Sequence, residues 1–223
     1  MDAAALIQPE LHTPRLRLRE FRADDAAALY AVHSDPRVMR YWSFAAWKRP
    51  EQAEAKVAAI LAERARGEVH VWAVADAPSD LVIGSIAVFS LHPAQARAEI
   101  GYSLHADWHG RGLAQEALRA VLAFLLDERG LERIEADIDP RNTASCRLVE
   151  RLGFVREGLL RERWRVEGEV SDSAVYGLLA RDFVRTGSIG SDASRAASGE
   201  TPGVPQESVA ACAAPTSAAG PRA

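Results

Sequence analysis

Three consecutive strand-like segments constrain the fold of this chain more than any other feature of its sequence. The segments 69–76, 81–91 and 97–104 are rich in apolar residues, and short connections join them. Short connections favour antiparallel hairpins. A helix pattern over 114–130 and a strand pattern over 133–140 follow. A strand–helix–strand connection is right-handed and makes its two strands parallel, so the sequence predicts an antiparallel meander joined to one parallel crossover.

Further helix and strand patterns flank this centre on both sides. Leucines and arginines alternate at the first strand pattern, and Pro36 is expected to stop the first helix. The order of elements predicts a single α+β (mixed α/β) domain. The flanking elements are strand 16–21 and helices 24–35 and 49–67 before the centre, and helix 142–153 and strands 154–165 and 172–180 after it.

Composition sets the ends of this domain and excludes several classes of function. The 223 residues carry a formal net charge of −4, so we expect no direct nucleic-acid partner. The stretch 186–223, rich in Ala, Ser, Gly and Pro, is predicted to be a disordered tail. Residues 1–12 are expected to form a loose lead-in, which leaves 13–185 as the folded domain. The N-terminal residues lack a secretory pattern and no long apolar run exists, so we expect a cytoplasmic protein without membrane contact.

Neither cysteine suggests a metal centre or a disulfide framework. Cys146 and Cys212 are far apart in the sequence, and neither belongs to a CxxC or Cys/His cluster. The sequence therefore predicts no metal.

The segment 108–118, WHGRGLAQEAL, places two glycines directly before a helix pattern. A helix N-terminus carries unpaired N–H groups, and glycines let a phosphate oxygen approach them. A Walker A loop is excluded because no lysine follows, and a dinucleotide fingerprint is disfavoured because Gln115 stands at its last position. A flexible turn into a helix remains open for the segment taken by itself.

Two longer motifs together carry a resemblance. EIGYSLHADWHGRGLAQEAL and NTASCRLVERLGFVREG resemble the GCN5-related N-acetyltransferase (GNAT) superfamily, and more narrowly its RimJ/RimL-type branch, over residues 13–183. The resemblance implies a central, mostly antiparallel twisted sheet of about seven strands with about four helices. It also implies that the fourth and fifth strands, 97–104 and 133–140, splay apart and hold acetyl-CoA as co-substrate.

The resemblance assigns most of the cofactor contacts to backbone groups. The superfamily loop Q/R-x-x-G-x-G/A corresponds to His109, Gly110, Arg111, Gly112, Leu113 and Ala114. Histidine departs from the pattern at the first position, and a solvent-facing side chain is the simplest expectation for it. A bulge is implied at Leu104 and His105, with the Leu104 N–H stabilising the negative charge that grows on the thioester oxygen.

The resemblance also assigns side-chain roles. Asn142 is implied to bind pantetheine, although an N-cap accounts for it equally well. Ser145 is implied to donate a hydrogen bond to the sulfur of coenzyme A, because Val149 stands where many members carry tyrosine. A hydrogen bond to the helix backbone is the alternative for Ser145. Glu99 is the expected general base, with Gly101 on the same face, and a surface glutamate is the alternative.

An aromatic stretch after the first helix supplies the weakest site prediction. Tyr41 and Trp42 either line the acceptor site or belong to the core under a long loop.

The leading hypothesis for function is an acetyl-CoA-dependent N-acetyltransferase in which a primary amine attacks the thioester directly. The acceptor is a protein N-terminal α-amine or a small-molecule amine. The alternative is a non-catalytic acyl-CoA-binding sensor module. The protein is expected to be a monomer or a homodimer.

Overall fold

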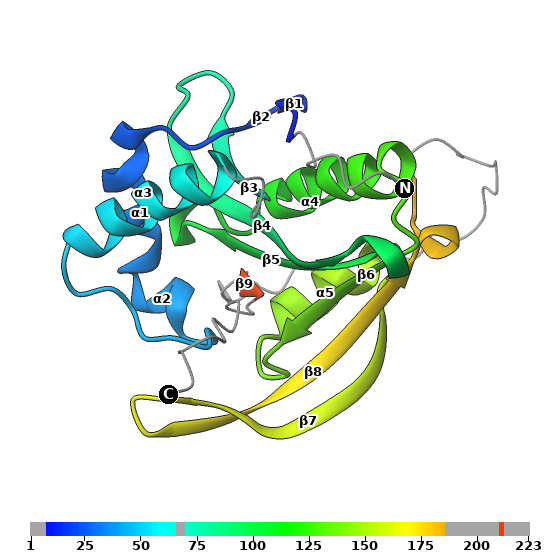
Figure 1. Cartoon of the computed structure of the whole chain (residues 1–223). Helices are drawn as coiled ribbons and strands as arrows, with labels where there is room; N and C mark the ends of the chain where they lie inside the picture. Colours follow the sequence, from blue (N-terminus) through cyan, green and yellow to red (C-terminus); the bar gives the residue numbers. More distant parts are fainter. Residues whose placement is uncertain (1–7, 66–69, 186–209, 212–223) are drawn as a thin grey trace, which may run out of the picture.

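A computed structural model describes residues 8–65, 70–185 and 210–211. The strands form one mixed sheet in the order β1-β2-β3-β4-β5-β6-β8-β7, with β9 beside β5 (Figure 1). β5 and β6 pair in parallel, and every other described pair is antiparallel. The predicted mixed α/β fold, with a meander and one parallel crossover, is therefore confirmed.

The elements have the following bounds. The strands are β1 Leu11–His12, β2 Leu16–Arg19, β3 His70–Asp76, β4 Val82–His92, β5 Arg97–Leu104, β6 Arg133–Ile138, β7 Val155–Val166, β8 Glu169–Leu179 and β9 Ala210–Ala211. The α-helices are α1 Ala26–His33, α2 Pro36–Met39, α3 Glu51–Ala65, α4 Leu113–Ala123 and α5 Thr143–Arg151. A π-helical turn, Phe124–Glu128, continues α4, and short 3₁₀ helices include Ala106–Trp108.

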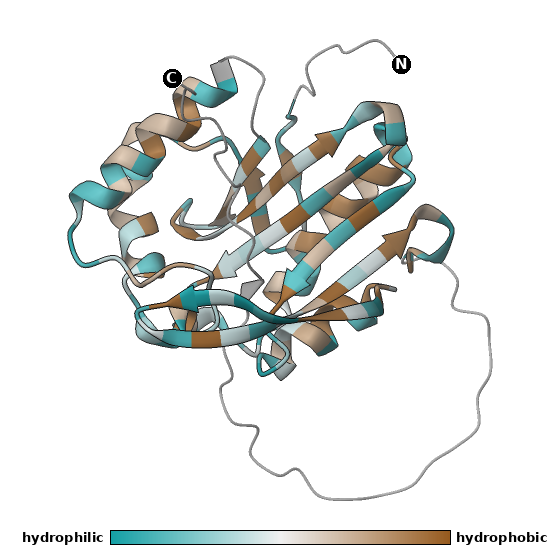
Figure 2. Ribbon diagram, turned by 60° about the horizontal axis from the view of Figure 1, so that its bottom comes forward, coloured by the Kyte–Doolittle hydropathy of each residue, from teal (hydrophilic) through white to brown (hydrophobic). Residues whose placement is uncertain are grey.

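Two hydrophobic clusters cover opposite faces of the sheet. The larger cluster contains the apolar sides of α4 and α5, and the smaller one contains those of α1 and α3. In Figure 2 the central strands are banded with hydrophobic and more polar residues, as alternation across a sheet requires. Along β5, Ile100 and Tyr102 belong to the larger cluster. Glu99, Gly101 and Ser103 therefore point to the opposite face.

β5 and β6 part soon after they begin to pair. Their register is limited to three positions and ends where Glu99 lies opposite Glu135. Beyond that point β9 pairs with β5 at Tyr102 and Ser103. We call the space between the parted ends of β5 and β6 the fork. It is the splay that was predicted between the fourth and fifth strands.

Several local predictions need correction. The bulge expected at Leu104 and His105 is absent, because β4 and β5 stay in one register from Phe89 opposite Glu99 to Gly84 opposite Leu104. The irregularity lies instead near the start of β5, between Phe89 and His92 of β4.

Further differences lie at the ends and at the helix predicted over 24–35. That helix ends at His33, as the proline rule suggests, but Pro36 also begins α2, since proline suits the first turn of a helix. The predicted lead-in includes β1, and the part of the predicted tail that the structure describes, Ala210–Ala211, forms β9. No helix in the described ranges is long and apolar enough to cross a membrane.

β4 and β5 approach each other closely at Gly84, and replacement of this residue tests the packing. A Cβ at Gly84 would lie 2.2 Å from the carbonyl oxygen of Ser103, which is backbone and cannot rotate away. We predict that Gly84→Ala lowers the free energy of unfolding by about 3 kcal/mol, measured by urea denaturation. Gly158→Ala is the control, because a Cβ there meets nothing within 4 Å. Equal stability of the two variants would contradict this packing.

Candidate active site

The glycine loop ahead of α4 passes through left-handed backbone conformations at both of its glycines. Gly110 and Gly112 adopt positive φ angles of 72° and 74°, in the left-handed region that favours glycine. A Cβ at Gly110 would meet nothing within 4 Å, so this position opens onto free space. The first intrahelical bond runs from the Glu116 N–H to the Gly112 carbonyl, at 3.1 Å. The amides of Leu113 and Ala114 belong to the first turn, whose N–H groups have no partner within the helix.

Contacts from the start of the chain hold this loop. Arg15 donates to the Glu116 carboxylate at 2.7 Å and to the Arg111 carbonyl oxygen at 2.8 Å. The Arg111 side chain turns back on its own loop, where it donates to the Asp107 carbonyl and lies over the ring of Trp108. The loop is therefore held by the N-terminal segment and by its own preceding residues. The sequence did not predict the role of Arg15, because its partners lie about a hundred residues away.

His109 differs from its prediction. Its side chain is buried instead of facing solvent, and its Nε2 lies 2.8 Å from the Leu104 carbonyl oxygen. Burial lowers the pKa of His109, which favours the neutral ring that donates one N–H. His109 thus ties the glycine loop to the end of β5.

The edge of β5 presents backbone groups to the fork. The His105 N–H donates to the carbonyl oxygen of Ile83, on the neighbouring strand β4, at 2.7 Å. Because N–H groups alternate along a strand, the Tyr102 and Leu104 N–H groups point the other way, toward the fork. His105 itself contributes its Nδ1 as an acceptor for the Asp107 N–H. Of the two residues predicted at a bulge, Leu104 therefore directs its N–H toward the fork, whereas the N–H of His105 is bonded to β4.

Ser145 lies opposite β5 at the start of α5. It is fully buried, and its hydroxyl makes a short contact with the phenol of Tyr102. Burial raises the pKa of Tyr102, so the phenol keeps its proton. Asn142 caps α5, since its Oδ1 accepts from the Ser145 N–H at 3.2 Å. The contact between Tyr102 and Ser145 was not predicted from the sequence, because only the fold brings the two residues together.

Two carboxylates with raised pKa values stand on the other face of the fork. Burial, and secondarily the charge of Asp137, raises the pKa of Glu99 to about 7. Burial also raises the pKa of Asp137 to about 6. Asp137 was not singled out from the sequence, where RIEADIDP reads as a strand with one acidic side. A carboxylate that titrates near neutral pH is suited to accept and release protons.

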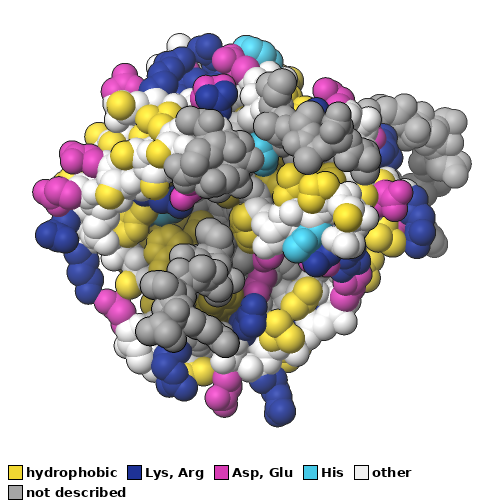
Figure 3. All heavy atoms as spheres, in the orientation of Figure 1, with side chains coloured by type: hydrophobic (Ala, Val, Ile, Leu, Met, Phe, Trp, Pro, Cys, Tyr) yellow, Lys and Arg dark blue, Asp and Glu magenta, His cyan; other side chains and the backbone are white. Residues whose placement is uncertain are grey.

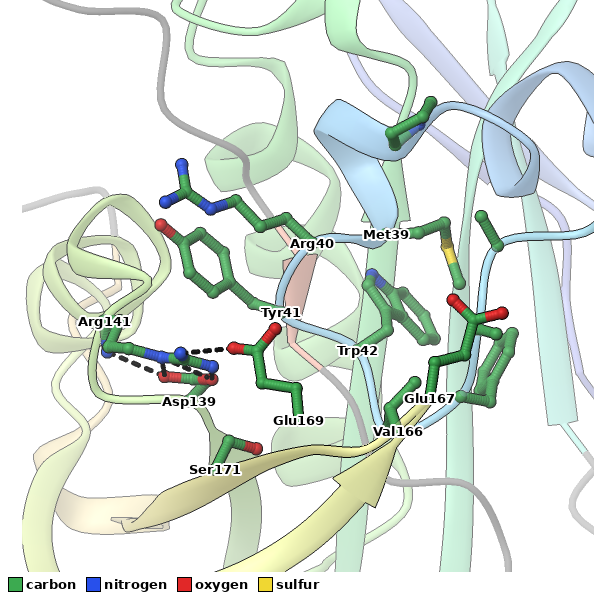
Figure 4. A pocket seen from close by; sticks show the side chains of 14 residues that line it. Met39, Arg40, Tyr41, Trp42, Asp139, Arg141, Val166, Glu167, Glu169 and Ser171 are labelled. Atoms are coloured by element: carbon green, nitrogen blue, oxygen red, sulfur yellow. Dashed lines mark hydrogen bonds and ion pairs between the residues drawn. The ribbon is translucent and has the colours of Figure 1, made fainter.

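A cavity of about 400 Å³ lies beyond the end of β6, where Asp139 and Arg141 line it. Tyr41 and Trp42, from the chain after α2, line it opposite the β7–β8 turn with Glu167 and Glu169 (Figure 4). Trp42 also packs in a small hydrophobic cluster around α2, so it belongs to the core as well as to the lining of this cavity. Figure 3 shows hydrophobic side chains in a hollow of this face, with charged side chains around it.

The comparisons with known proteins agree with this geometry. A family model described as an acetyltransferase (GNAT) domain matches residues 15–155. The chain is 32% identical over 173 residues to an uncharacterized N-acetyltransferase, p20, of Bacillus licheniformis, covering 78% of this chain and 97% of the relative. The chain belongs to the GNAT acetyltransferase family.

Relatives of this acetyltransferase include enzymes of ribosomal proteins, as the RimJ/RimL resemblance predicted. An Escherichia coli protein named as a ribosomal protein uS5 alanine N-acetyltransferase is 33% identical over 84 residues, covering 38% of this chain and 43% of the relative. A solved structure titled RimL, a ribosomal L7/L12 alpha-N-protein acetyltransferase in complex with coenzyme A, has a TM-score of 0.67 at 19% identity. The match covers 77% of this chain and 98% of that one. The likeness to RimL is one of fold.

The raised pKa of Glu99 has a consequence for stability. The folded state binds a proton more tightly than the unfolded chain, whose glutamate titrates near 4.5. Stability is therefore lost as the pH rises from about 4.5 through about 7. We predict that Glu99→Gln is more stable than the wild type at about pH 8, by about 1–2 kcal/mol after solvent screening, and equal to it at about pH 4.

Thermal unfolding at the two pH values measures this difference. Glu157→Gln is the matched control, because Arg133 lowers the pKa of Glu157 and its replacement removes a favourable contact. A Glu99→Gln variant that is less stable than the wild type at the higher pH would contradict the raised pKa of Glu99.

Proposed function

We propose that this acetyltransferase transfers the acetyl group of acetyl-CoA to a primary amine by direct attack on the thioester, with a protein N-terminal α-amine as the preferred acceptor. One observation supports this most. The backbone N–H groups of the glycine loop lie at one end of the fork. Glu99 lies on the face of β5 that also carries Gly101 and Ser103, which we call the acceptor face.

The loop amides and the edge of β5 would hold the co-substrate. Gly110 to Ala114 would bind the pyrophosphate through backbone N–H groups, aided by the partial positive charge of the α4 N-terminus. The pantetheine arm would run along the β5 edge, where the described pairing with β9 already demonstrates that an extended backbone fits beside Tyr102 and Ser103. RimL, a protein of the same fold, was solved in complex with coenzyme A, which supports coenzyme A as the ligand.

Residues on the two faces of β5 carry out different parts of the chemical step. Glu99 takes a proton from the acceptor ammonium, directly or through water, and leaves the electron pair on nitrogen for attack at the thioester carbon. The Leu104 N–H stabilises the developing oxyanion. When the C–S bond breaks, the Ser145 hydroxyl, held by the Tyr102 phenol, donates a hydrogen bond to the sulfur. The second proton of the nitrogen is released as the sulfur gains one.

The α-amine is the preferred acceptor for two reasons. Its ordinary pKa of about 8 makes it easier to deprotonate near neutral pH than a lysine amine, whose pKa is about 10.4. A base with a pKa of about 7, such as Glu99, suits that task. The cavity of about 400 Å³ and the named activity of the uS5 relative also fit a peptide terminus.

A non-catalytic acyl-CoA sensor is the second candidate. It needs the loop amides, but it needs neither a base at Glu99 nor a hydroxyl at Ser145. The two candidates therefore differ in turnover and not in binding of the co-substrate.

Release of free thiol from acetyl-CoA with a panel of peptides and small amines tests the proposal. We predict turnover with at least one peptide that has a free N-terminus. Glu99→Gln should lower kcat by about 10²-fold or more, as expected for loss of a general base. Ser145→Ala should lower kcat less and leave the affinity for coenzyme A nearly unchanged. Binding of acetyl-CoA without turnover of any amine would favour the sensor.

The strand β9 leads to a separate prediction, because it pairs with the same β5 edge that the pantetheine arm would use. Removing residues 186–223 deletes β9 and frees this edge. We predict a lower KM for acetyl-CoA in the shortened chain, with kcat unchanged at saturation. A control with Ala211→Pro in the full chain should act in the same direction, since proline lacks the N–H for pairing. Identical KM values in all three proteins would refute competition at this edge.

A further inference from the structure

The cavity beyond the end of β6 has two walls that hold different hydrogen-bonding groups. Arg40, Tyr41 and Trp42, from the chain after α2, stand on one side (Figure 4). Three carboxylates, from the chain after β6 and from the β7–β8 turn, stand on the other. The chemistry of a ligand for this cavity depends on which of these groups already have a partner within the protein.

Each carboxylate of the lining has a cation beside it. Asp139 accepts hydrogen bonds from Nε of Arg141 at 3.0 Å and from its Nη2 at 2.6 Å. Glu169 accepts from Nη1 of the same arginine at 2.5 Å, and Glu167 accepts from Nζ of Lys48 at 2.7 Å. The negative charges of the lining are therefore held in ion pairs within the protein.

Arg40 is the cation of the lining that has no such partner. No carboxylate of the described residues lies within ion-pair distance of its guanidinium, whose central carbon lies 5.1 Å from the centroid of the Tyr41 ring. An aromatic ring attracts a cation but does not cancel its charge. Arg40 is exposed, so a ligand in the cavity can reach its N–H groups.

Trp42 adds a second donor without a partner to the same wall. Its Nε1 is buried and has no hydrogen-bond partner among the residues that the structure describes. Neighbouring rings hold the indole, whose centroid lies 5.2 Å from that of Phe44 and 5.3 Å from that of His33. A buried N–H without a partner costs free energy, which a hydrogen bond to a ligand oxygen would recover. An indole N–H and a guanidinium can only donate, so both require an acceptor.

We propose that Arg40 and Trp42 form a carboxylate-binding subsite, and that the preferred acceptor is a primary amine with a carboxylate nearby, such as a peptide with Asp or Glu close to its N-terminus. This inference rests on the proposed function and narrows its acceptor class. A carboxylate has two oxygens, so one can accept from the guanidinium and the other from the indole N–H. The carboxylates of the facing wall oppose such an anion less than free acids would, because Arg141 and Lys48 lie beside them.

An acceptor with a basic side chain would use the cavity in the opposite way. Its cation would compete with Arg141 and Lys48 for carboxylates that these residues already hold. It would also leave the Trp42 N–H without an acceptor and place a like charge near Arg40. The unpartnered groups of the lining therefore favour an acidic acceptor over a basic one.

Acetylation of matched peptides tests the subsite. The peptides have a free N-terminus and an amidated C-terminus, and they differ only in Asp, Asn or Lys at the second, third or fourth position. We expect the wild type to prefer Asp over Asn at one of these positions by about threefold to tenfold in kcat/KM, as for a charge-assisted contact that is partly exposed. The preference should lie in KM for the peptide, with KM for acetyl-CoA unchanged.

Variants of the two donors should change this preference in different ways. Arg40→Gln should lower kcat/KM for the Asp peptide much more than for the Asn peptide, and Arg40→Glu should reverse the preference in favour of Lys. Trp42→Phe should weaken the preference, since phenylalanine keeps a ring beside Phe44 and His33 but lacks the N–H. Arg49→Gln is the control, because Arg49 is an exposed arginine of the same segment that does not line the cavity.

Free aspartate and its diamide, tested in the same assay, distinguish a small acidic amine from a peptide as the source of the carboxylate. Faster turnover of aspartate that depends on Arg40 would support the subsite with a small molecule as its ligand. Equal use of the Asp and Asn peptides at all three positions, a preference for Lys, or a preference for Asp that survives Arg40→Glu would overturn the subsite. Absence of turnover with any amine would instead count against the proposed function.

Discussion

The parting of β5 and β6 is the constraint on which the rest of the site depends. Their parallel pairing ends at Glu99 and Glu135, and from there the N–H groups of Tyr102 and Leu104 face away from β4. Unpaired backbone groups at a sheet edge need a partner. β9 supplies one in this structure, and an extended amide-containing ligand offers the same hydrogen bonds.

Side chains alternate between the two faces of β5, so the proton donor and the proton acceptor of the proposed reaction lie on opposite faces of this strand. On the face packed by α4 and α5, Tyr102 meets Ser145, and burial keeps the phenol protonated. On the opposite face, Glu99 is half-buried beside a glycine and across from a second carboxylate. One strand can therefore place a proton donor near the sulfur and a proton acceptor near the amine without bringing the two into contact.

The order of the strands and helices was predictable from the sequence. The predictions that failed concern contacts between residues and share one cause. The bounds of β5 and the glycine loop follow from local patterns, because alternation and helix starts are local properties. The burial of His109 and the Arg15 contact with the loop depend on the way the chain folds around them. RIEADIDP gives no sign that burial raises the pKa of Asp137. The missing bulge at Leu104 shows that a resemblance also does not fix local register.

The affinity of the glycine loop for coenzyme A tests the central claim most directly, with calorimetry on Gly110→Ala, Gly130→Ala and the wild type. Both glycines have positive φ angles, and a Cβ at either meets nothing within 4 Å, so the two changes carry similar backbone strain. We expect Gly130→Ala to match the wild type and Gly110→Ala to bind about tenfold or more weakly, because its methyl group enters the space of the pyrophosphate. Equal affinity in all three proteins, or no binding by the folded wild type, would contradict the account.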